Sequence, residues 1–275
     1  MDAIIPLLPL QQPKPNSEDE ATGDTKVKVV GLLADEQTAA RGTGNRAWKT
    51  GKGNLQYTFA IPRVAIPDRF LPMLPMIVGL SMRESVLEQW SAKLKDREEM
   101  KQLAGALRLK WPNDVLLGDS KLGGVLITEH SGGAKQSFML IGIGINVAFA
   151  PPVADGGRTA ASVSEIPERL GLKTLHGGDV VGDHSDTALV ELASAITTKI
   201  MTRIELGHRG VTDPRATVIA EFDRLMAKDV PLFRRNADGT RGRTVLPIRL
   251  KEWGELVVKD VENGDEDTLL ADYLL

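Results

Sequence analysis

The 275-residue sequence contains no cysteine. This absence excludes disulfide bonds, a thiolate nucleophile and cysteine ligands to a metal. Histidine is also scarce, and the positions of the four histidines do not have the spacing of a metal site. Each is expected at the surface or in a loop: His130, His176, His184 and His208.

The sequence has no strong excess of one charge. It contains 34 basic and 37 acidic side chains, which gives a formal net charge of -3. A chain so nearly balanced has no general electrostatic attraction to nucleic acid or to anionic lipid. Any nucleotide must therefore be held by a local group of residues. With 42% hydrophobic residues, the chain can bury the core of one domain or of a larger domain with a small appendage.

The first residues lack the marks of a targeting segment. A secretory signal needs a basic start and an unbroken apolar run, whereas this chain has Asp2, Pro6 and Pro9. The segment is poor in arginine, so a transit peptide is not expected. A membrane helix needs roughly 20 apolar residues, and no stretch of that length is expected in this sequence. These absences predict a soluble cytoplasmic protein.

The chain divides into three segments by composition. Residues 1–26 predict a flexible polar tail, and residues 27–226 alternate between strand and helix patterns. Residues 227–275 predict short strands separated by Gly/Asn/Asp turns, which favours a small all-β barrel. A helix is expected from Leu71 to about Lys95, followed by a charged run, Asp96–Gln102, expected to be a solvated helix end or surface insertion. Strands are expected at Val27–Leu33, Leu55–Ile61, Ala106–Trp111, Val115–Leu117, Leu122–Glu129 and Ser137–Val147.

One motif places charged side chains beside glycines. It reads Lys110-Trp111-Pro112-Asn113-Asp114, followed by Lys121-Leu122-Gly123-Gly124. Pro112 cannot donate to a central strand ladder, so a strand is expected to end there. A tight turn at 118–120 then returns Lys121 to Asp114, where the two side chains can hold Mg²⁺ and a triphosphate. The alternative is a turn with an exposed Lys–Asp pair worth under about 1 kcal/mol.

A second segment, Gln37–Trp48, predicts a glycine-rich basic loop. It contains Arg41 and Arg46, and arginine can bind phosphate in bidentate fashion while loop N–H groups cradle an anion. The alternative is a disordered loop without a ligand. Trp48 argues against that alternative, because a tryptophan is usually placed to cover something apolar.

Two standard nucleotide motifs are not supported. Gly42–Ala47 matches the dinucleotide pattern G-x-G-x-x-A, but residues 48–53 cannot sustain a helix, and no acidic residue follows until Asp68. Lys49-Thr50 resembles the end of a P-loop, yet the required glycine positions hold other residues. Gly142-Ile143-Gly144 is equally weak as a dinucleotide signature.

The motifs together resemble the biotin–protein ligase family. Their order and spacing, including Gly142–Val147 after the two segments above, match that family over about Val29–Val147, with a weaker match through Ala161–Glu165. The resemblance implies an α+β fold with a mixed sheet flanked by helices, similar to class II aminoacyl-tRNA synthetases and lipoate ligases. It also implies that the C-terminal barrel is SH3-like.

The resemblance implies an activity: ATP-dependent formation of biotinyl-5'-AMP, and transfer of biotin to a lysine of a biotin carboxyl carrier domain of carboxylases. It implies catalytic roles for Lys121, Arg41 and Asp114, with Asp114 at a Mg²⁺ that accompanies ATP. The implied contacts to biotin or the adenylate are Gln37, Arg41, Gly42, Thr43, Trp48, Lys121 and Gly124. The implied ATP contacts are Lys110, Asn113 and Asn146.

The chain departs from the family pattern in two places. Where the family has a Ser-Thr-Asn signature, which binds the ureido head of biotin, this chain has Pro15–Glu20. Either Asn16 and Ser17 substitute in part, or the N-terminal part of the pocket is missing or altered. Thr43 stands where the family loop often has arginine, so the intermediate is expected to escape more readily. A Thr43→Arg variant is then expected to release less free biotinyl-adenylate. Some relatives bind DNA through an N-terminal helix-turn-helix domain, but the short polar segment here predicts no DNA binding.

The sequence leaves two other functions open. One is an acyl-adenylating ligase for lipoate or octanoate, against which the motif Lys110–Asp114 favours biotin. The other is a pseudoenzyme that binds biotin or nucleotide, against which the joint presence of Asp114, Lys121 and Arg41 argues.

Overall fold

The computed structural model describes residues 29–42, 48–131, 137–152, 159–172, 184–208, 214–235 and 240–270. The predictions for the tail 1–26, for Pro15–Glu20, for Thr43 and for Arg46 lie outside the described residues.

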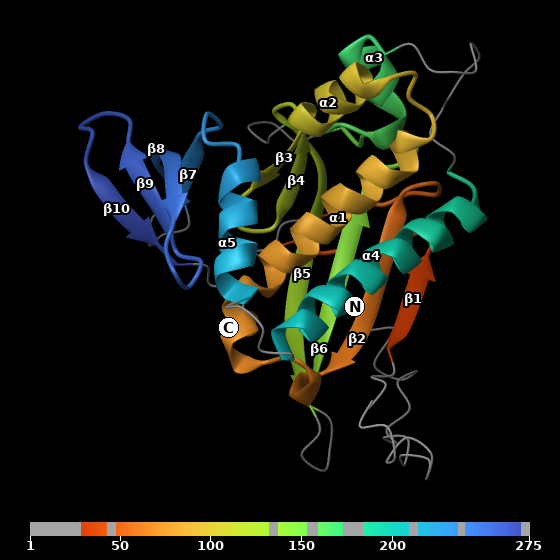
Figure 1. Ribbon diagram of the computed structural model, residues 1–275, viewed down its shortest axis with the longest axis horizontal. Helices are drawn as coiled ribbons and strands as arrows, with labels where there is room; N and C mark the ends of the chain where they lie inside the picture. The colour runs from red at the N-terminus through yellow and green to blue at the C-terminus, as the bar shows by residue number, and fades with distance from the viewer. Residues whose placement is uncertain are drawn as a thin grey trace.

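A six-stranded sheet forms the centre of the molecule (Figure 1). Its strand order is β1-β2-β6-β5-β4-β3, and every neighbouring pair is antiparallel. Parallel pairing enters through two isolated bridges, Leu109 with Met226 and Lys121 with Ala160, so the predicted mixed sheet is mainly antiparallel. The strands are β1 (Val30–Ala34), β2 (Leu55–Pro62), β3 (Leu107–Lys110), β4 (Asp114–Leu117), β5 (Ser120–Ser131) and β6 (Ser137–Ile145).

Helices cover one face of this sheet. The long helices α1 (Leu74–Ser91) and α4 (Asp186–His208) pack side by side, with α1 against β3, β4 and β5 and α4 against β2 (Figure 1). The other helices are α2 (Arg97–Ala106), α3 (Ile166–Leu170) and α5 (Pro214–Leu225), with short 3₁₀ turns η3 (Arg63–Ala65), η4 (Asp68–Met73) and η5 (Val163–Glu165). The predicted α+β architecture is confirmed.

The α1 segment corrects an expectation about apolar length. Asp68–Ser91 (η4 and α1) is long and apolar enough, by composition, to cross a membrane, and its most apolar 18-residue window has a mean hydropathy of 1.3. However, 83% of its most apolar window is buried inside the protein. A helix that is apolar on most sides belongs in a core as readily as in a bilayer. Here it supplies the largest share of the core against the sheet.

The charged run after α1 forms a helix of its own. Asp96 begins α2, and its Oδ1 accepts hydrogen bonds from the backbone N–H groups of Glu98 (2.9 Å) and Glu99 (3.0 Å). An aspartate in this position satisfies backbone donors that the first helical turn leaves unpaired. The charged run is therefore the start of a separate helix with mostly exposed side chains, as expected of a surface insertion, and not the end of α1.

A second, smaller sheet follows α5. Its order is β10-β9-β8-β7, and all pairs are antiparallel. An ion pair joins Arg234 on β7 to Asp267 on β10 at 2.5 Å, but no backbone ladder joins these two strands within the described residues. The sheet is thus open, and the predicted barrel closure is not observed in that part of the chain. The strands are β7 (Leu232–Arg235), β8 (Arg241–Leu250), β9 (Leu256–Asp260) and β10 (Glu266–Leu269).

The turn between β8 and β9 attaches the small sheet to the core. Gly254 accepts a hydrogen bond of 3.0 Å from the indole N–H of Trp111, which is buried. Gly254 has φ +86°, and a Cβ added there would lie 2.5 Å from the methyl carbon of Met76. A residue of the Lys110–Asp114 motif is thereby fixed to a turn 143 residues later in the chain.

Replacing Gly254 by alanine is expected to destabilise the protein by about 2–4 kcal/mol, because strained φ and steric overlap with Met76 act together. Gly264→Ala is the matched control: its φ is +79°, but the nearest atom to an added Cβ is the Lys259 side chain at 3.6 Å. That control is expected to cost only about 1–2 kcal/mol. Urea unfolding measures both, and equal losses would show that Met76 does not constrain the turn.

Candidate active site

A row of residues crosses the whole six-stranded sheet. Residues directly opposite one another on neighbouring strands point to the same face, so this row forms one continuous surface. Gly123 faces α1, since a Cβ there would lie 3.0 Å from the Met82 methyl carbon. The next residue, Gly124, belongs to the row, which therefore lies on the face away from α1. The cross-strand row is Ala34, Gln56, Gly144, Gly124, Asp114 and Lys110.

An acid between two lysines occupies one end of the row. The Oδ1 of Asp114 lies 2.7 Å from the ammonium of Lys121, and its Oδ2 lies 3.1 Å from that of Lys110. Burial alone raises the pKa of Asp114, but the charges and hydrogen bonds of the two lysines outweigh it and hold that pKa well below its usual range. The predicted hairpin and its Lys–Asp pair are confirmed, and the carboxylate is buried rather than exposed.

Both lysines keep access to the open face. Their side chains are 21% and 26% exposed for Lys110 and Lys121, whereas that of Asp114 is 8% exposed. An ammonium has three donors, and each lysine uses one on the carboxylate. The remaining donors can bind an anion placed over the row.

The backbone of Lys121 is held on both sides. Its N–H donates to the carbonyl of Thr159 (2.7 Å), and its carbonyl accepts from the N–H of Ala161 (2.9 Å). The side chain of Asn146 donates to the carbonyls of Lys121 (3.3 Å) and Ala161 (3.0 Å). Segment 159–161 therefore fixes the position from which the Lys121 side chain extends, a role that no sequence motif indicated.

The two asparagines of the predicted nucleotide site are both buried. Asn113 donates from its amide to the carbonyl of Val125 at 2.7 Å, so it ties the motif to β5. Asn146 uses its amide nitrogen as described, and its Oδ1 has no hydrogen-bond partner within the described chain. Their contacts with ATP stay predictions.

The adjacent glycines 123 and 124 serve opposite faces. A Cβ at Gly123 would lie 2.6 Å from the carbonyl oxygen of Gly144, so the core side has no space for one. A Cβ at Gly124 would lie 3.0 Å from both Asp114 Oδ1 and Lys121 Nζ. Glycine at 124 thus leaves space for the ion pair on the open face. Its place in a ligand pocket stays a prediction.

The basic loop returns to the same place through Trp48. The backbone N–H of Trp48 donates to the carbonyl of Ala40, next to Arg41, at 3.2 Å. Its indole packs directly on Gly144, where a Cβ would lie 2.8 Å from ring atoms, and the Lys121 ammonium lies 5.1 Å from the ring centroid. The loop and the lysine hairpin, predicted separately, therefore meet over the cross-strand row.

For the other predicted loop residues, the contacts given do not reach the cross-strand row. Gln37 is half-buried, and its backbone N–H donates to the hydroxyl of Thr50 at 3.0 Å. Arg41 is exposed, and Gly42 follows it at the end of the described part of the loop. Their contacts with a ligand stay predictions.

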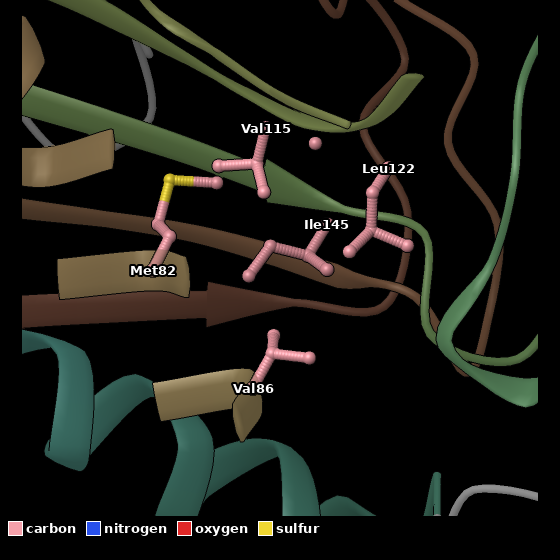
Figure 2. Close-up of a pocket in the computed structure, with 6 residues that line it drawn as sticks. Met82, Val86, Val115, Leu122 and Ile145 are labelled. Carbon is pink, nitrogen blue, oxygen red and sulfur yellow. The ribbon is translucent and has the colours of Figure 1, made fainter. Parts of the chain in front are cut away.

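A separate apolar gap lies on the other side of the sheet, between α1 and strands β4 to β6 (Figure 2). Figure 2 shows the side chains of Met82 and Val86 from α1 facing those from the sheet. No polar side chain lines it, so it is a packing feature of the core and not the predicted site. Its lining residues are Met82, Val86, Val115, Leu122, Gly123 and Ile145.

The described residues offer no cage for a metal ion. Among them, no group of three histidine or acidic side chains is placed to hold one. Both oxygens of Asp114 are paired with ammonium groups, so a cation bound there would have to displace Lys110 or Lys121. These residues do not fit a protein-held Mg²⁺ in this arrangement.

Sequence comparison finds relatives over the segment that carries these motifs. The profile of the Biotin/lipoate A/B protein ligase family matches residues 13–146. The biotin–[acetyl-CoA-carboxylase] ligase of Mycobacterium tuberculosis is 29% identical over 141 residues, 51% of this chain and 47% of that protein. The matched part spans less than half the length of the curated relatives.

Structural comparison extends the similarity to nearly the whole chain. The biotin protein ligase of Leishmania major, solved in complex with biotin, is 31% identical with a TM-score of 0.62, covering 93% of each chain. Its complex with biotinyl-5-AMP gives 30% identity and a TM-score of 0.61. The Aquifex aeolicus enzyme with biotin and ATP shares the fold, at 21% identity and a TM-score of 0.55. This match covers nearly the whole of both chains, and the site has the two lysines paired with Asp114 beside Gly124 and Gly144. The chain therefore belongs to the biotin protein ligase family.

Proposed function

We propose that this protein forms biotinyl-5'-AMP from biotin and ATP and transfers the biotin to a lysine of a biotin carboxyl carrier domain. The observation that carries the proposal is the Lys121 ammonium, held at 2.7 Å by the buried Asp114 over the glycines of the cross-strand row. This arrangement places a fixed positive charge beside positions without side chains, where it can stabilise the negative charge of an acyl phosphate. The family relationship specifies biotin as the acid.

In the first step, a carboxylate oxygen of biotin attacks the α-phosphorus of ATP. The bond from that phosphorus to the bridging oxygen of the leaving group breaks, and pyrophosphate departs with the electron pair. Negative charge spreads over the phosphate oxygens in the transition state, so fixed cations contribute most of the rate acceleration. Lys121 is proposed to contact the carboxylate and α-phosphate, with Lys110 beside it and Arg41 contributing from the loop.

In the second step, the neutral amine of the carrier lysine attacks the acyl carbon of the intermediate. The bond from that carbon to the phosphate oxygen breaks, AMP leaves, and the amine nitrogen loses a proton. Water competes for the same carbon. Trp48, packed on Gly144 beside Lys121, is proposed to cover the anhydride and exclude water.

We assign Mg²⁺ to the triphosphate of ATP rather than to a protein cage, in keeping with the ion-paired state of Asp114. We further propose that residues 27–226 carry the catalytic site and residues 227–275 support it, and that the enzyme acts in the cytoplasm. Acyl-CoA carboxylase carrier domains are the proposed acceptors.

The function is tested by exchange of labelled pyrophosphate into ATP with biotin, lipoate or no acid added. Exchange with biotin alone is the expected result. Exchange with lipoate alone would assign a different acid, and no exchange with either would contradict the proposal. Mass spectrometry of a carrier domain then tests the second step through the mass added at its lysine.

Gly144→Ala is expected to raise KM for biotin by about tenfold or more, because the added Cβ would lie 2.8 Å from the indole of Trp48 and displace it. Gly105→Ala, in α2 with no atom within 4 Å of an added Cβ, is the control and should leave KM unchanged. Equal KM values for the two variants would show that the contact between Trp48 and Gly144 is not needed for binding.

A further inference from the structure

Gln56 carries a buried side-chain carbonyl oxygen in the central sheet. Its residue is 3% exposed on β2, and its amide nitrogen donates to the carbonyl of Gly51 at 3.3 Å. That bond assigns which end of the amide is nitrogen and directs Oε1 elsewhere. No hydrogen-bond donor reaches Oε1 from the described residues.

A buried polar atom of this kind calls for a donor. Buried side-chain oxygens in folded proteins nearly always accept a hydrogen bond, since the bond to water lost on burial must be replaced. On β2, the residues that share a face with Gln56 are Thr58 and Ala60, because alternate residues of a strand point the same way. An apolar side chain would fill this position without the cost of an unpaired carbonyl.

Gln56 belongs to the cross-strand row, which also contains Asp114, the ion-pair partner of Lys121. It lies opposite Gly144, which lies opposite Gly124, where the Lys121 ammonium is found. Two strand spacings, about 10 Å, therefore separate Gln56 from the cationic end of the row. The one position of the row between them is Gly144, which has no side chain. The indole of Trp48 packs on Gly144, so it must move aside for a ligand to reach from Lys121 to Gln56.

Biotin has complementary groups at its two ends. Its carboxylate ends a flexible tail, and its ureido ring, at the opposite end, carries two N–H donors. We propose that Gln56 Oε1 accepts a hydrogen bond from a ureido N–H of biotin while the carboxylate lies at Lys121. This assignment rests on the proposed function and extends it by naming a residue that selects the acid.

The test is calorimetric titration of the full-length chain with biotin and, separately, with ATP. Gln56→Met keeps the length and apolar volume of the side chain but removes the acceptor. We expect this variant to bind biotin about tenfold to a hundredfold more weakly, with ATP binding unchanged within twofold. Gln102→Met is the control. Gln102 is an exposed residue of α2 whose amide donates to the carbonyl of Leu170 in α3, so its replacement should alter neither affinity.

Lipoate gives a second arm, because it has the same five-carbon acid tail and no N–H group. In the same titration, the ratio of the dissociation constants for lipoate and biotin should fall in Gln56→Met by the factor lost in biotin affinity. Unchanged biotin affinity would overturn the inference, as would an equal weakening of biotin and ATP, which would indicate general damage to the sheet. The two failures are distinguishable: the proposed function fails if the unsubstituted chain binds no biotin, whereas the role of Gln56 alone fails if that chain binds biotin and Gln56→Met binds it equally well.

Discussion

Lys121→Gln is expected to lower biotin-dependent pyrophosphate exchange by about 10²–10³-fold, the usual effect of removing one group that stabilises transition-state charge. Glutamine keeps two N–H donors and much of the side-chain length, but it removes the positive charge 2.7 Å from Asp114. Both substrates are already anions, and the negative charge that faces Lys121 grows in the transition state, so kcat should fall together with the affinities for biotin and ATP. Steady-state exchange at saturating biotin and ATP measures it.

Lys101→Gln is the control for that variant. Lys101 lies on α2, is 71% exposed, and pairs with Glu98 one turn away, an interaction worth little in water. Its rate should match that of the unsubstituted protein. If Lys121→Gln retains more than about a tenth of the exchange rate, the assigned catalytic role of Lys121 is wrong.

Asp114→Asn is expected to reduce exchange by about ten- to a hundredfold and to destabilise the protein by about 1–3 kcal/mol at pH 7. The carboxylate orients Lys110 and Lys121 together, and an amide of the same shape cannot accept strongly from both ammonium groups. The lysines are partly exposed and can turn toward water, which limits the loss of stability. Exchange kinetics and urea unfolding provide the two readouts.

The pH dependence of this stability has a definite sign. The pKa of Asp114 lies well below its usual range in the folded state, so the unfolded state takes up the proton first as the pH falls. The stabilisation is complete above the unfolded pKa of about 3.9 and is lost as the pH falls from there through the folded pKa. The difference between the native protein and Asp114→Asn should thus be constant from about pH 7 to 5 and shrink below about pH 4.

Asp119→Asn serves as the matched acid in the same hairpin. Asp119 pairs with Arg108 and is 74% exposed, so its replacement should cost under about 1 kcal/mol and leave exchange intact. A stability gap for Asp114→Asn that widens as the pH falls would have the opposite sign to the expected one and would contradict the assigned ion pairing.

The hairpin that forms the cationic end was predictable from local rules. Pro112 cannot continue a ladder, and Gly118 supplies the positive φ of 59° that a tight turn needs, so Lys121 had to return beside Asp114. Trp48 was expected to cover something apolar, and it packs on Gly144. These predictions held because each depended on residues close in sequence or on a single strong steric preference.

The remaining features depend on contacts between distant segments. No local sequence pattern indicates that residues 159–161 hydrogen-bond to the backbone of Lys121. The same is true of the hydrogen bond from Trp111 to Gly254. Nothing in the sequence marks Gln56, because Leu55–Ile61 alternates and a polar residue is ordinary on one face of such a strand. The strand register places it opposite Gly144. The helix begun by Asp96 was detectable from its cap, since an aspartate precedes Glu98 and Glu99.

The central claim is that the cross-strand row is the floor of one ligand site, with its anion-binding end at Lys121. A crystal structure with biotin and a non-hydrolysable ATP analogue tests it most directly. The predicted result is density over Gly124 and Gly144, with the biotin carboxylate and the α-phosphate both within hydrogen-bond distance of the Lys121 ammonium. Ligand density on the α1 side of the sheet, or over the row but out of reach of Lys121, would contradict the claim.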